Sequence, residues 1–264
     1  MNTNKNSYTL IYTTVMIVVI TFLLMFVSSA LKERQIANIE LDKKRQILSS
    51  LRLDLRGQDV NALFDKHIVG GLVINSNAEI LKESREAAFE INIAREFAKP
   101  LNERQLPIFI ADVNGQRKYI FGLRGAGLWG PLWGYVALEN DRNTIFGANF
   151  SHAAETPGLG SQIAERPFQE QFVGKRILND RRQFVSVAVM KVGQRADGRQ
   201  QVDALTGGTI TCKGVEKMLY NSLLQYDKFF QQASPATAEQ VSPVVAEQHF
   251  VAEEQTKTEE GGEE

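Results

Sequence analysis

The chain contains a single cysteine, Cys212, so it cannot form an internal disulfide, and its cysteine content does not indicate a compartment. We expect Cys212 to be a small buried packing residue and not a reactive thiol. Its three histidines, His67, His152 and His249, provide no basis for a metal site. The formal net charge of the 264 residues is −1 and no basic patch stands out, which argues against a nucleic-acid-binding protein.

Charge is also missing from the 26 residues between Asn6 and Leu31, whereas a helix needs only about 20 residues to cross the hydrocarbon core of a membrane. A cleaved signal peptide has a shorter apolar region, although Ser28-Ser29-Ala30 loosely imitates a cleavage site. The sequence therefore predicts a permanent N-terminal anchor over residues 1–32.

The charges beside this anchor do not decide its orientation. Lys5 and the terminal amine flank one end, while Lys32, Glu33 and Arg34 flank the other, so the two sides are nearly balanced in positive charge. Short bacterial-type anchors of this kind usually leave the N-terminus inside. We therefore expect a single-pass protein of the bacterial inner membrane with the rest of the chain on the periplasmic side.

The remainder divides into a domain and a tail. Residues 33–50 are charged and helix-prone, which predicts a juxtamembrane helix that leads into one soluble domain over residues 33–230. Residues 231–264 are rich in Ala, Pro, Thr and Glu, and the final 14 residues hold six Glu against one Lys. This composition is typical of a disordered acidic tail.

The domain mixes helical and strand patterns. The dipeptide Asn114-Gly115 between two apolar runs is a strong hairpin signal, and a second hairpin is expected across residues 141–143. Predicted helices cover 84–99 and 215–230, and predicted strands cover 106–113, 116–123, 133–138, 144–150, 184–192 and 200–205. Because hairpins are set apart from helices, we predict an α+β domain with an antiparallel sheet.

A small, hydroxyl-rich turn over residues 202–211 is the most informative segment for function. Its Gly207-Gly208 pair lets backbone N–H groups approach a ligand closely, and threonines surround the pair, as a phosphate cradle requires. It is not a Walker loop, because no G-x-x-x-x-G-K-[ST] spacing passes through these glycines. The alternative is a Gly-Gly turn that caps a helix starting near Gly214.

This turn resembles the D-x-x-[ST]-G-A-[ST] signature of FMN-binding domains, in which the flavin phosphate is esterified to the last hydroxyl residue. The resemblance implies a covalent FMN phosphoester on Thr209. Gly208 stands where the family usually has Ala, a minor departure that loosens the backbone. The other cofactor-binding residues expected in this segment are Asp203, Leu205, Thr206, Gly207, Gly208 and Thr211.

The segment Gly125–Gly130 matches the dinucleotide-binding pattern G-x-G-x-x-G letter by letter. We reject that interpretation because Pro131 and another predicted strand follow where a helix N-terminus is needed, and no acidic ribose ligand lies about 20 residues on. The stretch instead resembles G-x-G-L-W-x-x-[ML]-x-G-[YW] of NqrC, the flavin-carrying component of the Na+-translocating NADH:quinone reductase. A glycine-rich turn of this kind can place the side chain of Leu128 or Trp129 against a flat flavin ring.

Residues 155–160 repeat the E-T-P-G-[LI]-G loop of the same family. Glu155 and Thr156 offer an acceptor and a hydroxyl for polar edges of a flavin, Pro157 stiffens the loop, and Leu159 can pack on the ring face. Taken alone, the segment would be an ordinary Pro-Gly turn.

Together, the anchor and the three loops resemble the NqrC family of the Na+-translocating NADH:quinone reductase. The resemblance implies one covalent FMN that relays electrons between cofactors of partner membrane subunits, after attachment by a flavin transferase. No NADH site, iron–sulfur ligand set or quinone pocket is identifiable, so the chain is expected to act only as part of the complex.

Other families share some of these features. The RnfG component of the Rnf ferredoxin:NAD+ oxidoreductase has the anchor and the flavin threonine but usually lacks the Gly-Leu-Trp segment. A membrane-anchored FMN-binding redox sensor or assembly factor, and a flavin-free tethered domain, are further alternatives.

Overall fold

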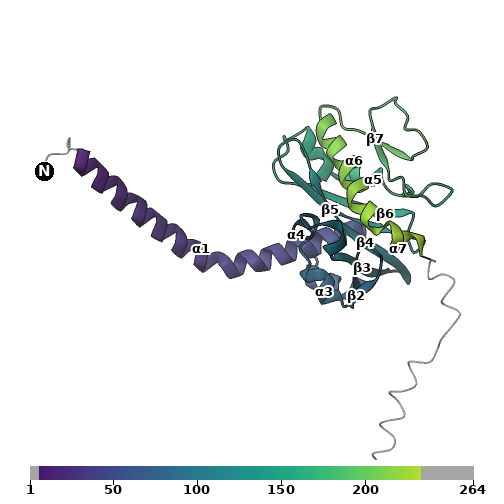
Figure 1. The fold of residues 1–264 in the computed structure, drawn as a ribbon, viewed down its shortest axis with the longest axis horizontal. Helices are drawn as coiled ribbons and strands as arrows, with labels where there is room; N and C mark the ends of the chain where they lie inside the picture. Colours follow the sequence, from purple (N-terminus) through teal and green to yellow (C-terminus); the bar gives the residue numbers. More distant parts are fainter. Residues whose placement is uncertain (1–5, 233–264) are drawn as a thin grey trace, which may run out of the picture.

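The computed structural model describes residues 6–232. Its first element, α1 (Asn6–Ser50), joins the predicted anchor and the predicted juxtamembrane helix in one continuous helix (Figure 1). The apolar stretch of α1 is exposed, whereas Ile47 and Leu48 at its end are buried in the domain. The predicted disordered tail after residue 232 lies outside the described residues.

The domain is built on a six-stranded antiparallel sheet with the order β2-β1-β3-β4-β5-β6. The α+β prediction is therefore confirmed. The strands of this sheet are β1 (Ile68–Ile74), β2 (Ile80–Glu83), β3 (Leu106–Val113), β4 (Gln116–Ala126), β5 (Pro131–Leu138) and β6 (Ile145–His152).

Both predicted hairpins of this sheet are present. Asn114 and Gly115 both have positive φ, 56° and 76°, and connect β3 to β4 in the geometry of a two-residue turn. Strand β5 pairs with β6 so that Leu138 lies opposite Ile145. Residues 125–130 form the end of β4 and its turn into β5, which excludes a dinucleotide-binding helix there.

Helices cover both faces of the sheet (Figure 1). One buried cluster joins the end of α1 with α2, α3 and the sheet, and the other joins α6 and α7 with the opposite face. The remaining helices are α2 (Val60–His67), α3 (Arg85–Glu90), α4 (Ile93–Phe97), η1 (Leu101–Glu103), η2 (Gly160–Ala164), α5 (Arg166–Glu170), α6 (Thr209–Leu223), η3 (Leu224–Tyr226) and α7 (Asp227–Gln231).

The single helix predicted over 84–99 is wrong, because the chain forms α3 and α4 with a break between them. Ile91 is extended, with ψ at 125°, and the Asn92 side chain caps α4 by accepting a hydrogen bond from the Arg95 N–H. The Lys43 ammonium of α1 donates to the carbonyls of Phe89 and Ile91 at the break. A cap and a long-range donor thus satisfy backbone groups that a continuous helix would pair internally.

The last two predicted strands, 184–192 and 200–205, differ from the antiparallel pairing expected for the domain. Strands β7 (Ala188–Met190) and β8 (Gln201–Asp203) are short and pair in parallel, because the connecting loop turns back on itself before β8 begins. The loop is held by its own polar side chains, since Gln201 accepts from the Ala196 N–H and donates to the Gln194 carbonyl.

The final helix begins earlier than predicted and is interrupted. Helix α6 starts at Thr209 instead of near Gly214 or Val215, and η3 separates it from α7. The turn over 203–209 therefore leads directly into a helix N-terminus.

Candidate functional site

The three loops singled out in the sequence meet at one buried carboxylate. Glu155, 5% exposed, accepts a hydrogen bond from the Thr211 hydroxyl through Oε2 at 2.6 Å. Its Oε1 accepts from the backbone N–H of Trp129 at 3.0 Å. Glu155 therefore links the loop after β6 to the loop between β4 and β5 and to the first turn of α6.

Two glycines leave the space that this carboxylate occupies. A Cβ added at Gly160 would lie 2.5 Å from Thr211 Oγ1 and 2.7 Å from Glu155 Oε2, and a Cβ at Gly127 would clash with Glu155 Oε1. Such distances are too short for real carbon contacts. The glycines of the two loop motifs thus permit the close approach of the loops.

The threonine turn ends at the N-terminus of α6, where the described chain places no capping side chain. Gly208 is the N-cap residue, and the first turn of α6 carries no acidic residue. The first N–H groups of a helix lack intrahelical partners and give this end a partial positive charge. The exposed Thr209 is the first residue of the helix, so its hydroxyl lies where backbone donors can bind phosphate oxygens.

Gly207 lets this turn pack closely against the side chain of Leu159. Its φ of +75° is unfavourable for other residues, and an added Cβ would lie 2.6 Å from Leu159 Cδ2. The neighbouring Gly208 has a negative φ of −106°, which alanine also adopts. The backbone conformation therefore does not require glycine at this position, where the family usually has Ala.

Large apolar side chains are exposed on these loops. Leu128 is 47% exposed, Trp129 66%, and Leu159 42%, although each belongs to a structured loop. Ile210, directly after Thr209, is 59% exposed and was not singled out from the sequence. Ile210 lies outside the buried face of α6, which includes Val215. An apolar residue outside the apolar face of a helix is the sequence signal that could have identified Ile210 as a candidate site residue.

The other predicted site residues surround this centre less closely. Thr156 and Thr206 are exposed. Asp203 is also exposed, and its backbone N–H donates to the Gln171 side chain at 2.8 Å. Leu205 is half-buried and its N–H donates to Cys212 Sγ at 3.3 Å.

The expectation for Cys212 is confirmed. The residue is 1% exposed and belongs to the core cluster beneath α6. Burial raises the pKa of its thiol, which disfavours the reactive thiolate.

Similarity to known proteins identifies the family of this chain. It is 31% identical over 240 residues to the NqrC component of the Na(+)-translocating NADH-quinone reductase of Pseudomonas aeruginosa, a match that covers 83% of this chain and 92% of that protein. The chain belongs to the NqrC family. Its counterpart in Vibrio vulnificus strain YJ016 is 30% identical over 200 residues, covering 70% of this chain and 78% of that one.

Solved NqrC structures and a domain family agree with this membership. The crystal structure of the protein from Parabacteroides distasonis has a TM-score of 0.71 and 42% identity, covering 77% of this chain and 98% of that one. NqrC of Shewanella oneidensis has a TM-score of 0.60 and 26% identity, covering 74% and 98%. The FMN-binding domain family matches residues 127–224, a range that contains residues 155–160 and 202–211 and all but the first two residues of the segment Gly125–Gly130.

Proposed function

We propose that this NqrC-family chain carries one FMN, held by a phosphoester on Thr209, and relays electrons among companion subunits of a Na+-translocating NADH-quinone reductase. The observation that carries the proposal is the exposed Thr209 hydroxyl at the first turn of α6, beside the two other family loops. FMN supplies the redox chemistry, and the chain supplies attachment, orientation and access.

The helix N-terminus suits the phosphate. Backbone N–H groups of the first turn can donate to its oxygens, and Gly208 keeps the approach free of a side chain. In the attachment step the Thr209 oxygen loses its proton and bonds to the phosphorus of the flavin donor, while the bond from that phosphorus to the donor's leaving group breaks. A simple phosphate monoester has a poor leaving group, so a flavin transferase must use a donor whose phosphorus carries a better one.

The exposed apolar side chains suit the flat ring system. Leu159 and Trp129, with Leu128 beside Trp129 and Ile210 in the first turn of α6, offer apolar surface that water would otherwise cover. With the phosphate end fixed at Thr209, a ring packed on these side chains would keep an edge accessible to the cofactor of a partner.

The hydrogen bonds of Glu155 favour a role other than the ring contact expected from the sequence. Both of its oxygens already accept hydrogen bonds within the protein, from Thr211 and from Trp129. We propose that Glu155 is a positioning residue, which holds the first turn of α6 and the tryptophan loop in register. Thr156 remains available for polar contact because its side chain is exposed.

The anchor determines where this relay works. The apolar stretch of α1 is long enough to span a membrane and is exposed in the isolated chain. With the N-terminus inside, the domain lies on the periplasmic side, next to the membrane subunits that supply and remove electrons.

Substitution of Thr209 tests the attachment. On a denaturing gel under ultraviolet light, only covalently held flavin remains fluorescent on the protein band. We expect Thr209→Ala to abolish this fluorescence, Thr209→Ser to keep part of it because the hydroxyl remains, and Thr206→Ala, the matched control in the same turn, to stay labelled. Full labelling of Thr209→Ala would refute the assignment.

A further inference from the structure

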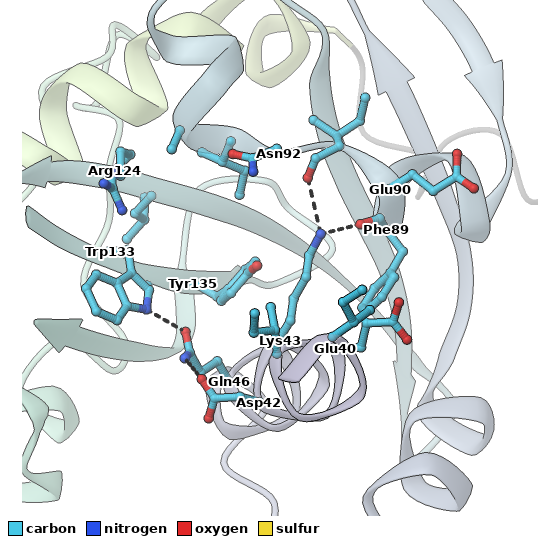
Figure 2. A pocket seen from close by; sticks show the side chains of 17 residues that line it. Glu40, Asp42, Lys43, Gln46, Phe89, Glu90, Asn92, Arg124, Trp133 and Tyr135 are labelled. Carbon is cyan, nitrogen blue, oxygen red and sulfur yellow. Dashed lines mark hydrogen bonds between the residues drawn. The ribbon is translucent and has the colours of Figure 1, made fainter. Parts of the chain in front are cut away.

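A cleft of about 710 Å³ lies between α1 and the sheet, on the face opposite to α6 (Figure 2). Its walls come from the part of α1 just after the membrane span, from the α3–α4 connection and from the ends of β4 and β5. None of the residues proposed to hold FMN lines it. The cleft is therefore separate from the flavin site.

Two polar groups of the cleft are already used for internal contacts. Lys43 donates to carbonyls at the α3–α4 break, and the Trp133 indole N–H donates to Gln46 Oε1 at 3.0 Å. Gln46 in turn donates to Asp42 at 2.6 Å. These contacts fix α1 against the sheet and keep the cleft in a defined shape (Figure 2).

Two other hydrogen-bond donors in the cleft, on Tyr135 and Arg124, are not engaged in side-chain hydrogen bonds or ion pairs within the described residues. Tyr135 is 5% exposed as a whole residue, and among residues 6–232 its hydroxyl has no hydrogen-bond partner, although it is not one of the fully buried polar atoms. Burial raises the pKa of Tyr135, so the hydroxyl keeps its proton. The Arg124 guanidinium lies 6.0 Å from the centre of the Trp133 ring and forms no ion pair within the described chain.

The entrance of the cleft is apolar and close to the membrane. Ile36 and Ile39 are 49% and 68% exposed and lie within a few turns of Leu31, the last residue of the uncharged stretch. Water-exposed isoleucines that continue a membrane helix mark a surface that another apolar group covers.

We propose that this cleft docks an extramembrane segment of a companion membrane subunit, which presents an apolar side chain to Ile36 and Ile39 and an oxygen acceptor to Arg124 and Tyr135. The proposal rests on the proposed function because a relay protein requires such companions. A subunit that packs against the membrane span of α1 would lie next to this entrance, because Ile36 and Ile39 follow that span directly.

The geometry disfavours a lipid headgroup as the occupant. A lipid headgroup layer is about 5–8 Å deep on each side of the hydrocarbon core. Gln46, beside Trp133, lies 15 residues beyond Leu31, roughly 22 Å along the helix, so this part of the cleft is beyond the reach of headgroups.

Charge also favours an acceptor-bearing partner. Of the acidic residues at the cleft, Asp42 accepts from Gln46, and Glu40 and Glu90 lie on the side away from Arg124, as Figure 2 shows. Arg124 therefore remains available to a carboxylate or a backbone carbonyl from outside, and a pair of this kind is a strong, charge-assisted contact.

The cleft and the loop that carries Trp129 both adjoin strands β4 and β5. Strands β4 and β5 continue from Arg124 and Trp133 into the loop that carries Trp129, and the Arg124 backbone N–H donates to Ser222 Oγ of α6 at 3.1 Å. A protein segment docked in the cleft would thus be held at the same end of these strands as the flavin site, on the other face of the sheet.

Photo-crosslinking in the assembled complex tests the proposal. We expect benzoylphenylalanine at position 39 to crosslink to a companion membrane subunit, whereas the same group at Val192, an exposed apolar residue in the β7–β8 loop, should give less than about a tenth of that product. A crosslink only to lipid, only to a second copy of this chain, or no crosslink at position 39 would overturn the proposal.

A charge reversal separates docking from folding and from flavin attachment. Arg124→Glu should reduce the companion subunits recovered with the chain from membranes by about tenfold, and Arg117→Glu, at the other end of β4, should not. The ultraviolet fluorescence of the band reports flavin attachment independently. Undiminished recovery with Arg124→Glu would contradict the docking surface, whereas absent fluorescence on the unaltered chain would contradict the proposed function.

Discussion

Glu155 is the residue on which the arrangement of the site depends most. It is a buried carboxylate whose two oxygens accept hydrogen bonds from residues 56 and 26 positions away in the chain. A hydrogen bond to a charged group contributes about 1.5–3 kcal/mol, and a buried group that loses its partner costs a similar amount. One side chain therefore sets the relative positions of Thr211 and Trp129.

A double-mutant cycle measures this coupling. Glu155→Gln and Thr211→Val should each lower the free energy of unfolding by about 1–3 kcal/mol. Together they should cost less than the sum of the two, with a coupling on the order of 1 kcal/mol, because both remove the same contact. Thr206→Val, at an exposed threonine of the same turn, serves as the control in denaturant unfolding. Additive costs would show that the contact contributes nothing.

Local sequence picked out the three loops that the structure brings together, but not the contacts between them. Thr209, Trp129 and Leu159 are recognisable because each lies in a short motif whose glycines and hydroxyls limit its conformation. The Glu155–Thr211 hydrogen bond joins distant segments, so no local pattern contains it. It also supports the positioning role that we propose for Glu155, in place of the flavin contact expected from the motif.

At the scale of elements, the attachment of α1 to the domain depends on Lys43. Its ammonium lies 4.5 Å from the centre of the Phe89 ring and donates to carbonyls at the break between α3 and α4. Burial lowers the pKa of Lys43 from 10.5 to about 8, although the neighbouring Glu40 opposes the shift.

The shift predicts a specific dependence on pH. Between about pH 8 and 10.5 the unfolded chain keeps the Lys43 proton and the folded chain has released it, so this group makes the free energy of unfolding rise with pH. Relative to Lys43→Met, the unaltered chain should gain on the order of 1 kcal/mol across this window, a value reduced for partial solvent screening. Guanidinium unfolding followed by tryptophan fluorescence measures the difference. A constant difference, or one that falls with pH, would contradict the assignment.

The elements themselves were predictable where turn chemistry is local. The hairpin at Asn114-Gly115 follows from two residues that tolerate positive φ. The break at Ile91 and Asn92 was not predicted, because it depends on Lys43 from a helix far away in the chain. The parallel pairing of β7 and β8 likewise depends on how their ten-residue connection folds, which periodicity does not encode.

At the scale of the whole molecule, a long apolar helix and an FMN-binding domain are joined without a flexible linker. Helix α1 runs unbroken from Asn6 to Ser50 and ends in the core against the sheet (Figure 1). The domain is therefore held at the end of α1, with α6 and the three family loops on one face of the sheet and the cleft on the other.

The proposed topology is testable in cells. Protease added to intact spheroplasts should digest the domain, because residues after about 32 are expected on the outer side. A cytoplasmic marker protein in the same sample should stay intact. Protection of the domain until the spheroplasts are lysed would reverse the topology.

Peptide mass mapping of the chain purified from its own membranes tests the central claim most directly. The account predicts that the peptide containing Thr209 carries the mass of one FMN joined with loss of water, and that fragmentation places the modification on Thr209 and not on Thr206 or Thr211. An unmodified Thr209, or a flavin attached to another residue, would contradict it.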